Sequence, residues 1–355
     1  MVGSMRISET WLEDTVWGGA LLGGGGGGSV AEGLAIGRTT FAVGRPLLVH
    51  PEDHPPDGTV VCCGLAVAPR PTRPFLLPGH QVRVVELLRE HLSGELTGLI
   101  AEGMGGRAIL DGWYASVVLD LPVLDLPADG RGHPLPLQGT LGLTGDPAYI
   151  SWQACAGGDP DRGEYLEMYV SGSLVAADKL ARRAAAQAGG TVFVARNPVR
   201  LERALIGGVV GGLHQAQGLG RDYRQQLGAG IPEATAWLAD RMQGNLHGEF
   251  VVGSQRTNYI SGLDLTVVEA PPYRLLAAGT VLTVEREGQL LTRFPDLVIL
   301  LDVLNGMPLT VSELTEGRTA LLITIPADSL RMGAGSRDPQ LLVTLEELTG
   351  RRMTI

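Results

Sequence analysis

Residues 96–126 carry the pattern of a strand, a helix and a second strand, and this restricts the possible folds more than any other segment does. Leu96 to Ala101 is a short apolar run typical of a buried strand, Gly106 to Leu119 has helical character, and Pro122 to Leu126 is again strand-like. Two strands joined by a helix run parallel in one sheet, with a right-handed crossover. The N-terminal part is therefore predicted to be an α/β domain with a parallel sheet and flanking helices.

The second half of the chain has a different pattern. From Gly248 onward apolar and polar residues alternate, and Thr280–Glu285 and Leu290–Phe294 flank a turn in the manner of a hairpin. The 355 residues also exceed the roughly 250–300 that one core usually serves. We expect an N-terminal domain over 1–170 and a C-terminal mixed domain over 171–355, with a β-barrel-like part from about 245.

Helical spacing of apolar residues occurs in both halves. It predicts helices over Ser8–Gly18, Ser29–Ala35, Gln81–His91, Ala176–Ala188, Val199–Gln217 and Ala234–Met242.

Charge and hydropathy narrow the class of partner. The chain has 28 basic and 38 acidic residues, a net charge of −10, and no local basic patch, so it is expected to bind neither nucleic acid nor anionic lipid. No apolar stretch reaches 18 residues, because Asp302 interrupts the best candidate, and the N-terminus lacks a secretory pattern. We expect a cytoplasmic protein with a small-molecule substrate, and a homo-oligomer is compatible with its glycine-rich helix faces.

The cysteine and lysine content excludes several chemistries. Cys62 and Cys63 are adjacent in an apolar run and, with Cys155, cannot form a disulfide framework. Lys179 is the single lysine, a bias typical of a GC-rich bacterial genome, and it leaves little room for Schiff-base catalysis. No Gly-x-Ser-x-Gly nucleophile motif is present.

Six consecutive glycines, Gly23–Gly28, precede a helix whose N-cap candidate is Ser29. A dinucleotide-binding fingerprint requires a strand before the glycines, and none precedes this run. A phosphate-binding loop requires a following Gly-Lys-Ser/Thr, which is also absent. A glycine loop that opens a helix exposes backbone N–H groups to an anion or a polarised oxygen, whereas the alternative is a tightly packed turn. The substrate-binding candidates are Gly24, Gly25, Gly26, Gly27 and Ser29, together with Gly105 and Gly106 of a second glycine-rich turn.

Acidic residues follow both strands of the strand–helix–strand unit. Glu102 comes after the first strand and Asp125 ends the second, and ligands lie outside the carboxyl ends of parallel strands. The loop after them adds Asp129, Arg131 and His133. A pair of acids beside an imidazole is suited to activating water, although both acids are equally well explained as helix caps or ligands of loop amides.

Two groups of side chains are candidates for holding a divalent metal, and the sequence leaves this cofactor open. His50, Asp53 and His54 lie within one Pro-rich turn. His133 with Asp125 and Asp129 is the better set.

Several motifs in a fixed order give the chain a family resemblance. They are Leu21-Leu22 with the glycine run, Glu102–Gly106, Leu121–Asp125 leading to Gly130–Pro134, Asn197-Pro198 into Ala204–Gly208, and Pro295–Val298 through Gly306–Leu309 to Glu316-Gly317. The chain resembles the S-methyl thiohydantoin desulfurase-like family over residues 9–326. The resemblance implies an N-terminal α/β domain, a C-terminal barrel-like part, and hydrolytic removal of a sulfur substituent from a five-membered cyclic amide.

The resemblance and the residues together suggest roles. The glycine loop, Ser29 and Asp129 would hold the substrate, Asp125 or Glu102 would activate water, and His133 or Arg131 would stabilise developing negative charge. The family usually has Thr at the position of Gly24, Asp at the positions of Ser29 and Pro127, and an acidic residue at that of Leu135. A non-catalytic, ligand-binding or regulatory role is therefore the alternative, and nucleotide binding at the glycine loop is a third hypothesis.

Overall fold

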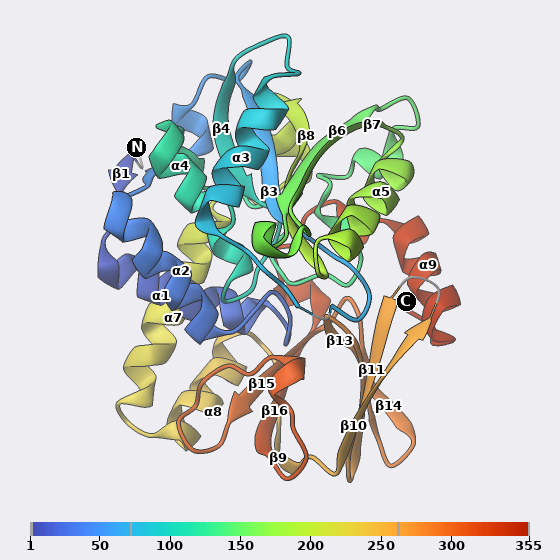
Figure 1. Cartoon of the computed structure of the whole chain (residues 1–355). Helices are drawn as coiled ribbons and strands as arrows, with labels where there is room; N and C mark the ends of the chain where they lie inside the picture. The colour runs from blue at the N-terminus through green and yellow to red at the C-terminus, as the bar shows by residue number, and fades with distance from the viewer. Residues whose placement is uncertain (1–2, 72, 261–262, 354–355) are drawn as a thin grey trace.

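The computed structural model describes residues 3–71, 73–260 and 263–353. A large mixed sheet with helices on its faces forms one part of the molecule, and two smaller antiparallel sheets form the other (Figure 1). The predicted fold class, an α/β part followed by a β-rich part, is confirmed.

The large sheet has the strand order β1-β2-β5-β4-β3-β8-β6-β7 among the described residues. Its strands are β1 (Met5–Arg6), β2 (Leu47–Val49), β3 (Thr59–Val67), β4 (Leu96–Ala101), β5 (Val123–Leu124), β6 (Ser151–Gly157), β7 (Leu166–Gly172) and β8 (Thr191–Arg200).

Parallel pairing is confined to one half of this sheet. Strands β2, β5, β4 and β3 are parallel neighbours, with Leu99 of β4 opposite Val123 of β5 and Cys62 of β3 opposite Ile100 of β4. The predicted adjacency of residues 96–101 and 122–126 is thus confirmed. Strands β8, β6 and β7 then continue the sheet in antiparallel fashion.

Helices cover the large sheet and one end of the β-rich part (Figure 1). They are α1 (Glu9–Leu22), α2 (Val30–Val43), α3 (Pro78–Arg89), α4 (Trp113–Leu119), α5 (Leu174–Gln187), α6 (Leu201–Gly207), α7 (Gly212–Leu227), α8 (Ile231–Arg241) and α9 (Pro339–Thr349). None of the helices in the described residues is both long and apolar enough to cross a membrane.

The single helix predicted over Val199–Gln217 is wrong. Strand β8 continues to Arg200, and the glycine-rich stretch 208–211 separates α6 from α7. Gly211 has a φ of +76°, outside the helical region, and its N–H donates to the carbonyl oxygen of Asp125 at 2.8 Å. The glycines thus break the helix and turn the chain so that α7 starts beside the end of β5.

Two antiparallel sheets make up the β-rich part. They share a core to which Phe250, Val268, Leu275, Leu300 and Leu322 belong. The strands are β9 (Asn245–Val251), β10 (Ser254–Ile260), β11 (Leu263–Ala270), β12 (Tyr273–Ala278), β13 (Thr280–Arg286), β14 (Gln289–Arg293), β15 (Leu297–Asp302) and β16 (Thr319–Ile325). Strands β13 and β14 form the predicted hairpin.

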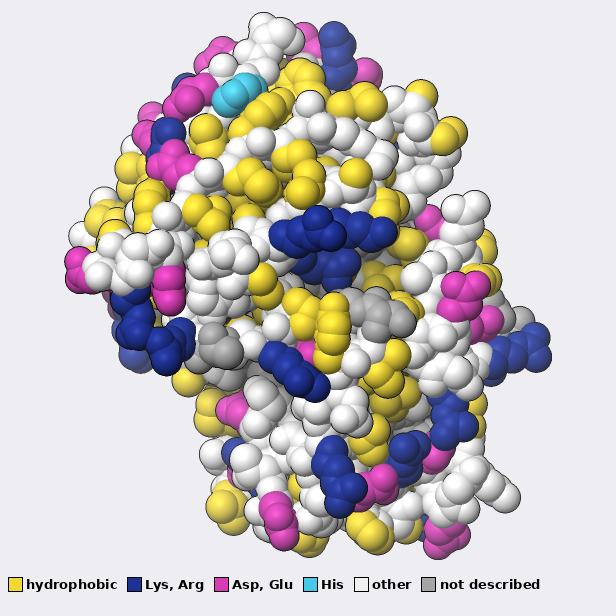
Figure 2. Space-filling model, turned by 45° about the vertical axis from the view of Figure 1, so that its right-hand side comes forward, with side chains coloured by type: hydrophobic (Ala, Val, Ile, Leu, Met, Phe, Trp, Pro, Cys, Tyr) yellow, Lys and Arg dark blue, Asp and Glu magenta, His cyan; other side chains and the backbone are white. Residues whose placement is uncertain are grey.

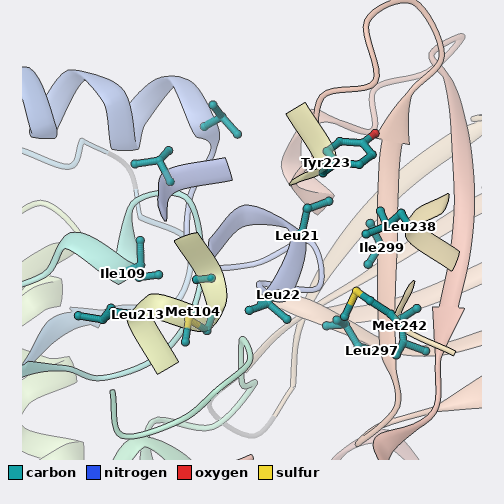
Figure 3. Packing of buried hydrophobic residues seen from close by; sticks show 14 of the residues in the cluster. Leu21, Leu22, Met104, Ile109, Leu213, Tyr223, Leu238, Met242, Leu297 and Ile299 are labelled. Atoms are coloured by element: carbon teal, nitrogen blue, oxygen red, sulfur yellow. The ribbon is translucent and has the colours of Figure 1, made fainter. Parts of the chain in front are cut away.

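A second hydrophobic core joins α1, α7 and α8 to β15, and Figure 3 labels members from each of these elements. Helices α1 and α7 approach closely because glycines lie at their contact. A Cβ added to Gly18 would lie 1.7 Å from the carbonyl oxygen of Ala216, and one added to Gly220 would lie 1.9 Å from that of Asp14. Because α1 runs directly into the glycine run, this core fixes where that loop begins.

Candidate functional site

A cleft of about 690 Å³ lies where the ends of β3 and β4 face the β-rich part. Its walls come from the glycine loop, the ends of β3 and β4, the loop at His133, the β12–β13 junction, and strands β10 and β11. Ligand pockets typically occur at such junctions between parts of a chain.

The glycine loop is fastened by its carbonyl groups. The carbonyl oxygen of Gly24 accepts from Val281 N–H at 2.9 Å, that of Gly25 from Val311 N–H at 2.8 Å, and that of Gly27 from Ala108 N–H at 2.8 Å. The loop is therefore tied to both parts of the molecule. Positive φ angles at Gly24, Gly25, Gly27 and Gly28 make this path available to glycine and strained for other residues.

The N–H groups of the same loop are largely unused. Within the part of the chain that the structure describes, the N–H groups of Gly25, Gly27 and Gly28 donate no hydrogen bond to protein atoms, whereas that of Gly26 donates to the carbonyl oxygen of Gly23. All four glycines line the cleft. Since backbone donors at a site are normally paired, the three unpaired N–H groups are candidates for binding a carbonyl or oxyanion oxygen.

Other predicted loop residues lie behind this surface. Ser29 caps α2, because its Oγ accepts from Glu32 N–H at 3.2 Å while Glu32 Oε2 accepts from Ser29 N–H at 2.6 Å. Gly106 N–H donates to the Gly28 carbonyl at 3.0 Å, and Gly105 packs against the backbone of Gly27. Gly24 packs against Thr280 Oγ1 and Leu297. These residues shape the loop from behind.

Glu102 lines the cleft as the first residue after β4. Its side chain is 9% exposed and forms an ion pair with Arg196 of β8, which also faces Asp178 of α5 at 3.6 Å. The carboxylate has room because glycines flank it: a Cβ added to Gly64 would lie 2.0 Å from Glu102 Oε2. Arg196 was missed in the sequence, although an arginine inside the otherwise apolar run 191–196 is the signal that finds it.

Asp125 lies away from the cleft, at the N-terminus of α7. Its Oδ1 accepts from Leu213 N–H at 2.7 Å and from His214 N–H at 3.4 Å, and its Oδ2 contacts His214 Nδ1 at 2.5 Å. The carboxylate is fully buried. The structure therefore does not bring Asp125 and Glu102 together, although their strands are neighbours, and the geometry of Asp125 is that of a helix cap.

Asp129 and Arg131 are fully buried and bind backbone groups. Asp129 accepts hydrogen bonds from Gly130 N–H, Gly333 N–H and Ser336 Oγ. Arg131 donates to the carbonyls of Gly132, Pro295 and Asp296, with its guanidinium 4.4 Å from the centre of the Phe294 ring. They hold the loop against the β-rich part and do not line the cleft.

His133 lines the cleft and is held in one tautomer. Its Nδ1 lies 3.0 Å from the carbonyl oxygen of Leu135. Because a carbonyl only accepts, Nδ1 carries the proton, and a neutral ring then leaves Nε2 as an acceptor beside Gly103. Burial lowers the pKa of His133, an effect that nearby Asp129 opposes, so the neutral form predominates at neutral pH. This imidazole is equipped to accept a proton at Nε2.

A second arginine–carboxylate pair lines the cleft and was missed in the sequence. Arg107 Nη1 donates to Asp111 Oδ1 at 2.5 Å, and the Asp111 side chain is 4% exposed. Burial raises the pKa of Asp111 to about 6, against the effect of Arg107. Arg107 and Arg196 of the cleft are thus each paired with a carboxylate. On the face shown in Figure 2, charges of both signs are likewise interspersed, apart from a small group of Lys and Arg side chains near the middle.

Neither of the predicted metal sets is assembled. No group of three or more His, Cys, Asp or Glu side chains suited to a metal ion is found among the described residues. The cysteines offer no nucleophile at the cleft either. Cys62, Cys63 and Cys155 are buried, and burial raises the pKa of Cys62 and of Cys155 to about 12 each.

Comparison with known proteins shows matches to two family models and a similarity to a solved structure. The model of the S-Me-THD-like N-terminal domain matches residues 10–160, and that of the S-Me-THD-like C-terminal domain matches residues 173–332. An X-ray crystal structure of a protein from Chromobacterium violaceum, a structural genomics target, is similar with a TM-score of 0.68. The two chains are 17% identical, and the match covers 97% of each. No curated protein matches the chain.

Proposed function

The chain belongs to the S-Me-THD-like family, and from the chemistry of its cleft we propose that it is a hydrolase that removes a sulfur substituent from a small thiohydantoin-type ring. The observation that carries the proposal is that unpaired loop N–H groups and the proton-accepting Nε2 of His133 line one cleft. An oxyanion-binding surface and a base in one cleft are what hydrolysis of a cyclic amide derivative requires.

In the proposed reaction His133 activates water. Water attacks the ring carbon that bears the sulfur substituent while Nε2 accepts its proton. The electron pair of the carbon–nitrogen double bond moves onto the ring nitrogen next to the carbonyl, whose oxygen shares the charge. The N–H groups of Gly25, Gly27 and Gly28 donate to that oxygen. Those of Gly25 and Gly28 are held in place because the carbonyls of the same peptide groups, Gly24 and Gly27, are hydrogen-bonded.

Collapse of the intermediate completes the replacement of the sulfur substituent by oxygen. The carbon–sulfur bond breaks, the imidazolium of His133 returns its proton to sulfur, and the thiol leaves. The second hydrogen of water moves to the ring nitrogen, which yields the cyclic diamide. Glu102, held by Arg196, is placed to accept a hydrogen bond from a ring N–H.

The experiment is turnover of an S-methyl thiohydantoin, followed by release of methanethiol. His133→Gln is expected to lower kcat by about 100-fold or more, the usual contribution of a general base, without changing the melting temperature by more than a few degrees. His91→Gln is the control, because His91 stacks on Tyr169, 3.7 Å between ring centres, and does not line the cleft.

Two outcomes would contradict the proposal. Full turnover by His133→Gln would show that His133 is not the general base. Thermal stabilisation by thiohydantoins with no product from the unaltered protein would favour a ligand-binding role. The same assay with ATP or NAD tests nucleotide binding at the loop.

A further inference from the structure

The cleft is larger than the reaction requires. Its volume of about 690 Å³ lies in the range of pockets that hold drug-sized ligands, several times what one five-membered ring fills. The glycine loop and His133 occupy only one side of it. The rest of the cleft is therefore available to another part of the ligand.

That remaining wall is mostly apolar on the side of β3. Leu65 and Val67 from the end of β3 lie there with Pro69, Pro71 and Leu263. Val67 is 46% exposed although it is a hydrophobic residue at the end of a strand. Covering such water-exposed apolar surface with an apolar group of the ligand lowers the free energy of the complex.

Each arginine that lines the cleft is paired with a carboxylate, and two further acids of the cleft, Glu32 and Asp264, accept hydrogen bonds from backbone N–H groups. Arg107 pairs with Asp111, Arg196 pairs with Glu102, and Arg182 pairs with Asp178 at 3.1 Å. Asp264 Oδ2 accepts from the N–H of Arg70. An anionic substituent on the ligand would have to leave water and displace one of these carboxylates to reach an arginine, which is unfavourable.

From these observations, and resting on the proposed function, we infer that the substrate carries a large, uncharged and mainly apolar substituent on its ring. Rings with an isobutyl or benzyl group fit this description. Rings with a carboxymethyl or carboxyethyl group, and the unsubstituted ring, do not. The substituent would lie against Leu65 and Val67 while the ring carbonyl meets the glycine loop.

The test is a substrate series measured by both turnover and binding. S-Methyl thiohydantoins with isobutyl, benzyl, carboxymethyl or no substituent are compared by kcat/KM and by calorimetric Kd. We expect kcat/KM to be at least tenfold higher, and Kd at least tenfold lower, for the isobutyl and benzyl rings than for the other two. Tighter or equal binding of the carboxymethyl or unsubstituted ring would overturn the inference.

A pair of variants tests whether the apolar substituent lies against the end of β3. Val67→Asp is expected to reduce the preference for the apolar substituents over the unsubstituted ring about tenfold. Val251→Asp is the matched control, because Val251 also ends a strand and is 52% exposed, yet does not line the cleft. An equal effect of the two variants on selectivity would overturn the placement of the substituent.

The two proposals fail in different ways. Selective binding of the apolar rings without product would contradict the hydrolase and keep the inference. Turnover of every ring at similar kcat/KM would contradict the inference and keep the hydrolase. Binding of none of the rings would contradict both.

Discussion

Asp125 and His214 hold each other at the start of α7. The carboxylate is fully buried, the imidazole is 36% exposed, and the ring of Trp11 meets that of His214 edge-on, with 5.6 Å between the ring centres. The hydrogen bond that His214 Nδ1 donates to Asp125 raises the pKa of His214, and desolvation opposes this effect. The imidazole therefore binds its proton more tightly in the folded state than in the unfolded state.

This pair predicts a pH-dependent contribution to stability. Because the folded-state pKa of His214 is raised, the contribution is fully present below about pH 6.5, the unfolded value, and is lost as the pH rises through the folded value. The free energy of unfolding of the unaltered protein relative to His214→Gln should thus fall as the pH rises above about 6.5. Its size should be below about 1 kcal/mol, since the imidazole is partly solvated. Urea titrations of both proteins at several pH values measure it, and a constant difference would contradict the assignment.

For individual residues, the sequence predicted which side chains follow the strands but not the direction in which each side chain points. Glu102 and Asp125 were both placed at ends of neighbouring parallel strands, and the strands are neighbours. The direction of each carboxylate depends on its nearest partner, however. For Asp125 that partner is the first turn of α7, 88 residues away, and for Glu102 it is Arg196 on β8. Such long-range partners leave no local pattern.

Among the elements, the glycine loop depends most strictly on its residues. Gly27 has a φ of +70°, and a Cβ there would lie 2.5 Å from the carbonyl oxygen of Met104 and 2.7 Å from Gly105 Cα. Both neighbours are backbone atoms, so neither can move aside cheaply. Gly163, at the end of a surface turn, has a φ of +68° with nothing within 4 Å of the added Cβ. A side chain at Gly163 would thus meet backbone strain alone, whereas one at Gly27 would meet both backbone strain and a steric clash.

We therefore expect Gly27→Ala to destabilise the protein more than Gly163→Ala does. The left-handed backbone alone costs roughly 1–2 kcal/mol for a residue with a Cβ, and overpacking adds about 1–3 kcal/mol at Gly27. Chemical denaturation of both variants gives the comparison. Equal losses of unfolding free energy would mean that the loop relaxes away from Met104 and Gly105.

Elements with a strong local pattern were predictable. The two strands of the strand–helix–strand unit and the hairpin of β13 and β14 follow from apolar runs and turn residues close in sequence. The helix between the two strands, α4, begins at Trp113 and not at the expected Gly106. The break between α6 and α7 was not predicted, because Gly208–Gly211 are stabilised there by contacts such as that of Val209 N–H with the Pro127 carbonyl. Glycine spacing alone does not distinguish close helix packing from a helix end.

On the scale of the whole molecule, β8 is the strand on which the large sheet depends. It lies between β3 and β6 and is antiparallel to both, yet it comes from residues 191–200, beyond the expected domain boundary at 170. Its arginine also pairs with Glu102 of the cleft. Both the sheet and the cleft therefore combine residues from the two halves of the chain.

The last prediction concerns a fragment of residues 1–170. Without β8 this fragment leaves the long edges of β3 and β6 unpaired and exposes buried positions such as Cys62 and Ala154, so we expect it not to fold alone. Its amide NMR spectrum should be poorly dispersed and its thermal melt non-cooperative. Co-expression with residues 171–355 is the control, because the second fragment supplies β8 and should restore a cooperative melt. A well-dispersed spectrum of the fragment alone would show that β6 and β7 fold against β3 without the strand between them.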